Sequence, residues 1–159
     1  MPASPLPSYA VVSPVLNEAE YLARTADAMV AQTHKPLRWV IVDDGSSDDT
    51  RAIAERYASS HPWITVIDSG AQQTRARGGK IVRAFNRGLE TLPCRPDVVV
   101  KMDGDILLAA HYFAWVMRTF ARVPRAGIVG GRSYTFDGRR WSSNDARHCG
   151  SSVDATPVG

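Results

Sequence analysis

Two pairs of aspartates stand directly behind runs of β-branched residues, and carboxylates in such positions can do chemistry. The pairs are Asp43 with Asp44 and Asp103 with Asp105. Carboxylates held close together repel one another, and a raised pKa, a basic partner or a bound cation relieves the repulsion. Their oxygens suit a hard cation such as Mg²⁺ or Mn²⁺, which keeps open positions for substrate phosphates. The two pairs therefore indicate a divalent cation that holds a phosphorylated ligand.

The spacing of the second pair sets a condition on this hypothesis. Alternate residues of an extended segment point to opposite faces, so Asp103 and Asp105 converge only if the chain turns at Gly104. Taken alone, each pair has a simpler explanation, because Asp, Gly and Ser are common in polar turns. Both pairs, however, end Val- and Ile-rich runs of the kind that form buried strands. Chance placement is therefore the weaker explanation.

Short β-branched runs alternate with segments of helical periodicity along the chain. Strands are expected at residues 9–12, 39–42, 64–67, 98–102 and 127–129. Helices are expected where apolar residues recur at helical spacing, namely at Leu22, Ala26, Met29 and Val30, at Ile53 and Tyr57, at Ile81, Phe85, Leu89 and Leu92, and at Phe113, Val116, Met117 and Phe120. Asn17 is the expected N-cap of the first helix, and Ser46 or Ser47 that of the second.

This alternation predicts an α/β domain with a mainly parallel, Rossmann-like sheet and helices on both faces. In such sheets, ligands bind in a crevice outside the carboxyl ends of the strands. Both aspartate pairs would lie at that edge, together with Pro14, Asn17 and Glu18, which follow the first strand. The predicted fold therefore brings together the residues that the cation hypothesis requires.

The composition is that of an ordinary globular protein and excludes several classes of function. The 159 residues are 44% hydrophobic and 22% charged, enough for one buried core. The net charge of +3 is too small for a nucleic-acid-binding footprint. Cys94 and Cys149 have no second Cys or His at metal spacing, which argues against a zinc site. A basic stretch, which suits either a solvated helix face or an anionic diphosphate, comprises Arg75, Arg77, Lys80, Arg83 and Arg87.

The first eight residues include three prolines and show no periodicity, so residues 1–8 are expected to form a flexible leader. They contain no apolar signal segment. The most apolar stretch, residues 106–117, is shorter than the roughly 20 residues that cross a bilayer. We therefore expect a cytoplasmic protein with no membrane span in this chain, whose contact with a membrane would be peripheral, at the inner membrane face.

Three motifs in register resemble those of the family 2 glycosyltransferases of the GT-A fold. They are VVSPVLNE at residues 11–18, WVIVDDGSSDDT at 39–50 and VKMDGDI at 100–106. The resemblance implies a nucleotide-diphospho-sugar transferase fold, with a nucleotide-sugar-binding domain at 9–131 and the start of an incomplete acceptor-side region at 132–159. It also implies metal-dependent, inverting transfer of a sugar from a nucleoside diphosphate donor, usually a UDP-sugar, to a hydroxyl acceptor. Polysaccharide or glycolipid synthesis would use such a transfer.

The resemblance assigns four residues to the nucleoside of the donor. Pro14, Leu16 and Glu18 would line the nucleoside pocket, and Asp44 would hydrogen-bond the base. Leu16 stands where the family commonly has an aromatic residue.

Three further residues are assigned by the resemblance to the diphosphate and the sugar. Lys80 would reach the nucleotide, Asp103 would face the ribose and the sugar, and Asp105 would bind the Mg²⁺ or Mn²⁺ ion on the diphosphate. The leaving diphosphate gains negative charge as the glycosidic bond breaks. A cation and a lysine stabilise that charge more in the transition state than in the ground state.

Inverting transfer also needs a carboxylate that takes the proton of the acceptor, and the family has this base well downstream of the D-x-D motif. The chain ends at Gly159 before such a motif, so the catalytic base is expected outside the chain. Trp141 is a candidate for contact with the acceptor. Tail residues that could in principle serve as the base are Asp137, Asp145, His148 and Asp154. An alternative function is therefore a catalytically incomplete fragment that binds nucleotide sugars.

A second enzyme class also uses a D-x-D motif. In haloacid-dehalogenase-type phosphatases the first aspartate, here Asp103, would be a nucleophile and the second, here Asp105, a general acid. That alternative leaves Asp43 and Asp44 unexplained, and it puts Ile106 where Thr or Val is usual. A P-loop and a dinucleotide-binding fingerprint are excluded, because the glycines that they require are missing.

Overall fold

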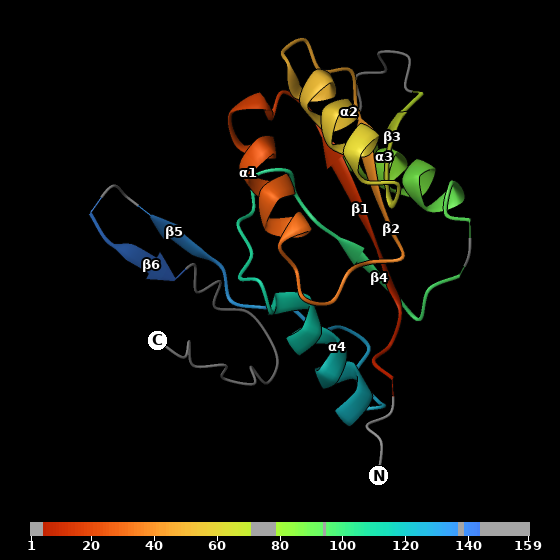
Figure 1. Ribbon diagram of the computed structural model, residues 1–159, viewed down its shortest axis with the longest axis vertical. Helices are drawn as coiled ribbons and strands as arrows, with labels where there is room; N and C mark the ends of the chain where they lie inside the picture. The colour runs from red at the N-terminus through yellow and green to blue at the C-terminus, as the bar shows by residue number, and fades with distance from the viewer. Residues whose placement is uncertain (1–4, 71–78, 94, 137–138, 144–159) are drawn as a thin grey trace. The chain divides into compact units, whose positions relative to one another are not determined.

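Parallel strands and helices alternate in the larger of two units in this computed structural model. The structure describes residues 5–70, 79–93, 95–136 and 139–143. The chain forms two compact units, residues 1–124 and residues 125–159. In chain order, the first unit contains β1 (Tyr9–Val15), α1 (Ala19–Val30), β2 (Arg38–Asp43), α2 (Thr50–Ser60), β3 (Ile64–Asp68), α3 (Gly79–Glu90), β4 (Val98–Lys101) and α4 (Tyr112–Arg122) (Figure 1).

The strands of this unit form one parallel sheet in the order β3-β2-β1-β4. β1 lies inside the sheet, paired with β2 from Ala10 to Val15 and with β4 from Tyr9 to Val12. Six of its seven residues are buried, as expected for a parallel strand covered on both faces. Because the strands all run the same way, their carboxyl ends meet at one edge of the sheet.

Helices cover both faces of the sheet (Figure 1). α3 packs on one face, against a buried cluster of valines on β1 and β2. Gly88 permits this close approach, since a Cβ added there would lie only 2.4 Å from Val12 Cγ1. α1 and α2 lie side by side on the other face, and the Tyr57 hydroxyl of α2 donates to the Ala23 carbonyl of α1 at 3.1 Å. The predicted α/β architecture is therefore confirmed.

Four of the five predicted strands form, and the prediction of a fifth at residues 127–129 is wrong. Ile128 is 92% exposed there, because one Ile and one Val between glycines offer little apolar surface to bury. The second unit instead contains an antiparallel pair, β5 (Tyr134–Phe136) and β6 (Trp141–Ser143), which the sequence analysis did not predict. Within the described residues, no helix combines the length and the apolar character needed to cross a membrane.

The predicted helix caps are also wrong. Glu18 is the N-cap of α1 and Asp49 that of α2, and neither side chain makes a capping hydrogen bond. Asn17, the predicted cap of α1, adopts a left-handed backbone with φ of 57°. Asn17, Ser46 and Ser47 hydrogen-bond with one another across two loops, so these side chains are not used to cap their own helices. Such long-range partners are invisible to a local capping rule.

Two helices bury residues other than those predicted. Ile81 is 57% exposed, because α3 turns Ala84 and Gly88 toward the sheet instead. Small residues at these positions bring the helix axis close to the strands. The other three residues of the predicted stripe are partly buried against the valine cluster, namely Phe85, Leu89 and Leu92. In α2, Ile53 and Tyr57 are only partly buried.

The predicted leader is anchored at its last residue. The Ser8 amide and hydroxyl donate to the Asp97 carboxylate at 2.8 and 2.7 Å, just before β4 begins. Residues 1–4 of this leader lie outside the described residues.

Candidate functional site

The carboxyl end of β1 brings the two aspartate pairs to the same edge of the sheet. On one side of β1, the Asp44 amide donates to the Val15 carbonyl at 2.9 Å. On the other side, the Met102 amide donates to the Val12 carbonyl at 3.1 Å, and Asp103 follows directly. The segments after β2 and after β4 therefore flank the end of β1, as the cation hypothesis requires.

The turn that separates Asp103 from Asp105 packs tightly against β1 and α1. Gly104 is buried, and a Cβ added to it would lie 2.9 Å from Val15 Cγ1 and 3.3 Å from Glu18 Cγ. The chain turns at Gly104 as predicted, but without a positive φ. Glycine is thus needed here for close approach rather than for a left-handed backbone.

Carboxylates from three segments crowd together at this edge. Burial raises the pKa of the Glu18 carboxyl group, and the negative charges of Asp105, Asp103 and Asp48 raise it further. Asp103 has a basic partner, because Lys101 forms an ion pair with it. Among the described residues, Asp105 has no such partner. A raised pKa therefore relieves the repulsion at Glu18, and a basic partner relieves it at Asp103.

The raised pKa of Glu18 predicts a pH dependence of stability in the absence of metal. The folded state disfavours the ionised carboxylate, so the penalty is absent below about pH 4 and grows as the pH rises through the raised pKa. A Glu18→Gln variant is therefore expected to be more stable than wild type at neutral pH in EDTA, and equally stable near pH 4. Urea unfolding at several pH values measures this, and a difference that does not change with pH would contradict it.

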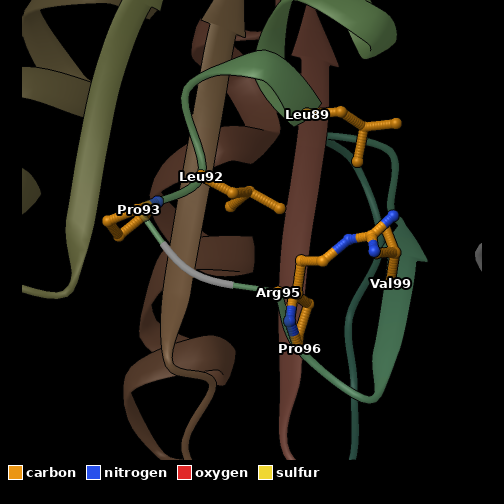
Figure 2. A pocket seen from close by; sticks show the side chains of 6 residues that line it. All are labelled: Leu89, Leu92, Pro93, Arg95, Pro96 and Val99. Carbon is orange, nitrogen blue, oxygen red and sulfur yellow. The ribbon is translucent and has the colours of Figure 1, made fainter.

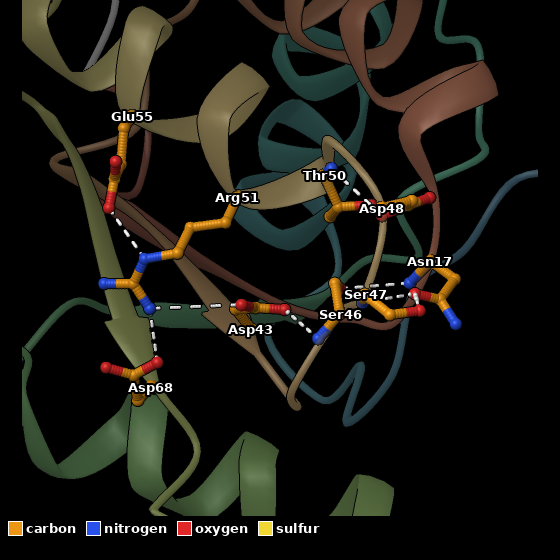
Figure 3. A network of polar contacts seen from close by, with 9 residues as sticks. All are labelled: Asn17, Asp43, Ser46, Ser47, Asp48, Thr50, Arg51, Glu55 and Asp68. Atoms are coloured by element: carbon orange, nitrogen blue, oxygen red, sulfur yellow. Dashed lines mark hydrogen bonds and ion pairs between the residues drawn. The ribbon is translucent and has the colours of Figure 1, made fainter.

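Figure 3 shows how the loops after β1 and β2 are fastened to each other. The Asn17 side-chain oxygen Oδ1 accepts from the Ser47 main-chain amide at 2.8 Å, and the Asn17 main-chain amide donates to the Ser46 hydroxyl at 3.0 Å. Asn is one of the few non-glycine residues that tolerate the left-handed backbone seen at Asn17. The two loops therefore form one unit that holds the start of α1.

A second set of contacts in the same loops caps α1 from a distance. Thr50 is fully buried, and its hydroxyl accepts from the Glu18 amide at 2.7 Å and donates to the Asp48 carboxylate at 2.5 Å. The other oxygen of Asp48 accepts from the Ala19 amide at 3.1 Å. Amides at the first turn of a helix have no partner within the helix, and here the β2–α2 loop supplies one. Thr50 and Asp48 thus form a cross-cap, that is, a cap of α1 made by residues of another segment, and it fixes the position of Glu18.

Replacing Thr50 by valine is expected to lower the free energy of unfolding by about 1–3 kcal/mol, because it leaves the Glu18 amide without its partner. Denaturant unfolding measures the change. Ser47→Ala is the matched control, since it removes an exposed hydroxyl of the same loop and should change stability by less than about 0.5 kcal/mol. Equal losses in the two variants would contradict the cross-cap.

The two aspartates of the first pair have different surroundings. Asp43 is 4% exposed, accepts from the Ser46 amide at 3.0 Å and lies 3.9 Å from Arg51, which also contacts Asp68 (Figure 3). Asp43 therefore holds the loop and is not free for a ligand. Asp44 is half-buried at the strand edge, and its carboxylate has no hydrogen-bond partner among the described residues.

The remaining predicted ligand-binding residues follow the same edge. Pro14 is near the end of β1, paired with Val42, and Leu16 follows the strand with 47% of its surface exposed. Lys80 is half-buried near the start of α3. Because the far end of α3 leads to the amino end of β4, the start of α3 lies toward the carboxyl edge. The structure thus brings Pro14, Leu16, Glu18, Asp44, Lys80, Asp103 and Asp105 to one end of the sheet.

Several other candidate residues fall in parts of the chain that the structure does not describe. Arg75, Arg77, Cys94, Asp137, Asp145, His148, Cys149 and Asp154 lie outside the described residues. Sequence reasoning also missed three site-supporting residues, namely Thr25, Asp48 and Thr50. A single threonine, or an aspartate two positions before a threonine, is too common in protein sequences to have identified them.

A hollow of about 490 Å³ lies elsewhere, between the end of α3 and the start of β4 (Figure 2). Its walls are mainly apolar, and its one charged side chain is Arg95. Val99, near the amino end of β4, lines it, whereas Asp103 and Asp105 follow the other end of that strand. The hollow lacks carboxylates and is separate from the acidic edge.

The donor atoms at the acidic edge fit a hard divalent cation. Asp103 and Asp105 are exposed carboxylates, and Mg²⁺-type ions need only one or two of these when phosphate and water oxygens complete the shell. The described residues contain no group of three His, Cys, Asp or Glu side chains that could enclose a metal. The arrangement therefore suits an ion that binds together with a phosphorylated ligand.

Comparison with known proteins points in the same direction. The model of the family described as Glycosyl transferase family 2 matches residues 10–154. A protein of Nostoc sp. (strain PCC 7120), described as the uncharacterized glycosyltransferase alr2836, is 30% identical over 113 residues, which are 71% of this chain and 33% of the relative. Glycosyltransferase AglE of Haloferax volcanii is 28% identical over 132 residues, 80% of this chain and 40% of the relative. The chain thus spans about a third to two fifths of these curated relatives.

Solved structures share the fold. The mannosyltransferase PcManGT from Pyrobaculum calidifontis, in complex with GDP-Man and Mn²⁺, superposes with a TM-score of 0.60 at 25% identity, covering 74% of this chain and 33% of that protein. Glucosyl-3-phosphoglycerate synthase from Mycobacterium tuberculosis, with Mn²⁺, UDP and glucosyl-3-phosphoglycerate, gives a TM-score of 0.55 at 22% identity, covering 72% and 39%. The parallel sheet described above is therefore of the GT-A type.

Proposed function

The chain belongs to glycosyltransferase family 2, and on that premise we propose that it binds a nucleoside diphosphate sugar at the carboxyl edge of its sheet, for sugar transfer to a hydroxyl acceptor. The observation that supports this most is Asp105, an exposed carboxylate beside Glu18 and Asp103 that lacks a basic partner among the described residues. A carboxylate in this setting attracts a divalent cation, and a cation with open positions attracts a diphosphate.

The residues of the edge divide into a nucleoside side and a diphosphate side in this proposal. Pro14, Leu16 and Glu18 would contact the nucleoside, and the partnerless carboxylate of Asp44 would accept a hydrogen bond from the base. Asp44 lies beside the end of β1, within reach of the same ligand. We infer a UDP-sugar donor from the motifs, and the GDP-Man complex of PcManGT keeps a guanine nucleotide among the candidates.

On the diphosphate side, Asp105 would hold Mg²⁺ or Mn²⁺ and Asp103 would face the ribose and the sugar. The bound ion would stabilise negative charge on the leaving diphosphate. The Mn²⁺ in the PcManGT complex supports a divalent ion here as well. Lys101 pairs with Asp103 and would have to release it for Asp103 to face the sugar. Lys80, near the start of α3, would approach the diphosphate as a second positive charge.

For the chemical step, we propose inverting transfer with a catalytic base that lies outside this chain. The donor-binding region would comprise residues 9–131, and residues 132–159 would begin the acceptor side. This chain would then bind donor but turn over slowly or not at all. Donor hydrolysis, assayed on this chain and on a longer one of the same protein, distinguishes a donor-binding part from a complete transferase.

Thermal unfolding with a panel of ligands tests donor binding. UDP or GDP with Mn²⁺ is expected to raise the melting temperature, whereas the nucleoside alone with Mn²⁺ is not, because it lacks the diphosphate. Absence of a shift with every nucleoside diphosphate at millimolar concentration would reject the proposal. A shift that EDTA does not reduce would reject the role of the cation.

A further inference from the structure

Two buried polar side chains, one on α1 and one just after it, hold the segment that joins β4 to α4. On α1, the Thr25 hydroxyl donates to the Gly104 carbonyl at 2.8 Å. Two residues beyond the end of α1, the Gln32 side-chain nitrogen donates to the Ala109 carbonyl at 2.8 Å, and its oxygen accepts from the Phe113 amide at 3.2 Å. Thr25 is 0% exposed and Gln32 2%. Thr25 thus supports the acidic turn, residues 103–105, and Gln32 supports the start of α4.

Thr25 makes the contact that matters for the acidic turn. The turn is fixed at one end by the Met102 amide, bonded to Val12, and at the other by Ala109. Between these points, Thr25 adds a side-chain hydrogen bond to the main chain of the turn, at the Gly104 carbonyl. The carboxylates of Asp103 and Asp105 are exposed, so packing does not hold them in place.

The presence of threonine at position 25 is best explained by this hydrogen bond. A β-branched polar residue within a helix is less favourable than Ala or Leu, and its hydroxyl usually bonds a carbonyl of the same helix. Thr25 instead lies among the buried apolar residues of α1 and donates to a distant segment. A buried hydroxyl costs free energy unless it is hydrogen-bonded, and valine has the same shape without that cost. The hydrogen bond to the Gly104 carbonyl offsets the cost of burying the Thr25 hydroxyl.

We propose that Thr25 is a positioning residue for the acidic turn, and this inference rests on the proposed function. By fixing the peptide group between Asp103 and Asp105, Thr25 sets the direction in which both carboxylates leave the main chain. It touches neither the ligand nor the cation. Partners of this kind, one step removed from the ligating atoms, typically change metal affinity about 10–100-fold when they are lost.

The test compares Thr25→Val with Thr25→Ser, which keeps the hydroxyl. Mn²⁺ affinity in the presence of UDP, followed by the electron paramagnetic resonance signal of free Mn²⁺, is expected to fall about tenfold or more in Thr25→Val. Thr25→Ser should restore most of it. Ile41→Val is the stability control, since Ile41 is fully buried on β2, which pairs with β1 and β3 and not with β4. Unchanged affinity in Thr25→Val, or an equal loss in Ile41→Val, would overturn the proposal.

A second measurement separates failure of this inference from failure of the proposed function. The backbone order parameters of residues 103–106, measured by NMR relaxation, need no ligand, and they should fall in Thr25→Val but not in Ile41→Val. If wild type binds no Mn²⁺ with any nucleotide, the proposed function fails, while lower order parameters would still support Thr25 as the anchor of the turn. Unchanged order parameters in Thr25→Val would refute the anchor itself.

Discussion

Replacing Asp105 with alanine is expected to abolish the stabilisation that a nucleoside diphosphate and Mn²⁺ give the protein. A ligand at 100 times its dissociation constant stabilises a folded protein by about 2.7 kcal/mol, which is a readily measured shift in melting temperature. Asp105 is an exposed carboxylate near Glu18 that has no basic partner among the described residues, so its loss would remove the proposed ligand of the cation. Without the ion, the diphosphate would meet the remaining carboxylates unscreened.

Asp27→Ala is the matched control for this prediction. Asp27 is an exposed aspartate on α1 that accepts from the Tyr57 hydroxyl at 2.6 Å, and its loss changes the net charge by the same amount. It should keep the full nucleotide-dependent shift, because it lies on the side of α1 that faces α2. A shift that survives in Asp105→Ala, or that disappears in both variants, would contradict the assignment of Asp105.

A large effect on stability is expected at Gly88. A Cβ there would lie 2.4 Å from Val12 Cγ1 and 2.9 Å from Val42 Cγ2, and both valines are fully buried in the middle of the sheet. Neither side chain can move without disturbing its neighbours. Gly88→Ala is therefore expected to lower the free energy of unfolding by about 1–3 kcal/mol, measured by denaturant unfolding.

Gly79→Ala provides a control within the same helix. A Cβ at Gly79 would meet the end of the Arg83 side chain at 2.9 Å, and that flexible side chain can swing away. The change should therefore alter stability by less than about 0.5 kcal/mol. If Gly88→Ala were as harmless as Gly79→Ala, the close packing of α3 on β1 and β2 would be wrong.

Much of the architecture could be predicted because it follows from local patterns. The Val- and Ile-rich runs that became β1 to β4 are continuous apolar segments, which is typical of parallel strands buried on both faces. Once these strands were parallel, topology alone placed Asp44 and the Asp103–Asp105 turn at one edge. The motif resemblance to the family was confirmed by a family match over residues 10–154.

The supporting contacts could not be predicted, because their partners are far apart in the sequence. Asn17 was predicted as a helix cap, yet its side chain accepts from Ser47, and Thr50 caps α1 from the start of α2. Nothing in the sequence distinguishes Thr25 from its neighbours in α1, and the carbonyl to which it donates lies 79 positions away. In each case the sequence shows a polar residue that can form a hydrogen bond, but not the group that receives it.

Packing distances were equally hidden from the sequence. The turn at Gly104 was predicted, but the need for glycine there also comes from packing, since a Cβ would lie 2.9 Å from Val15 Cγ1. Ile81 was expected in the core, but Ala84 and Gly88 bring α3 so close that its buried face shifts. These outcomes depend on the shape of the opposing surface, which no periodicity encodes.

An anomalous-difference map at the manganese edge, from crystals grown with UDP and Mn²⁺, tests the central claim most directly. One strong peak is predicted beside the Asp105 carboxylate, with the two phosphates next to it and the base toward Asp44. A peak at another place on the molecule, or a nucleotide bound away from the carboxyl ends of β1, β2 and β4, would contradict the assignment of this edge as the donor site.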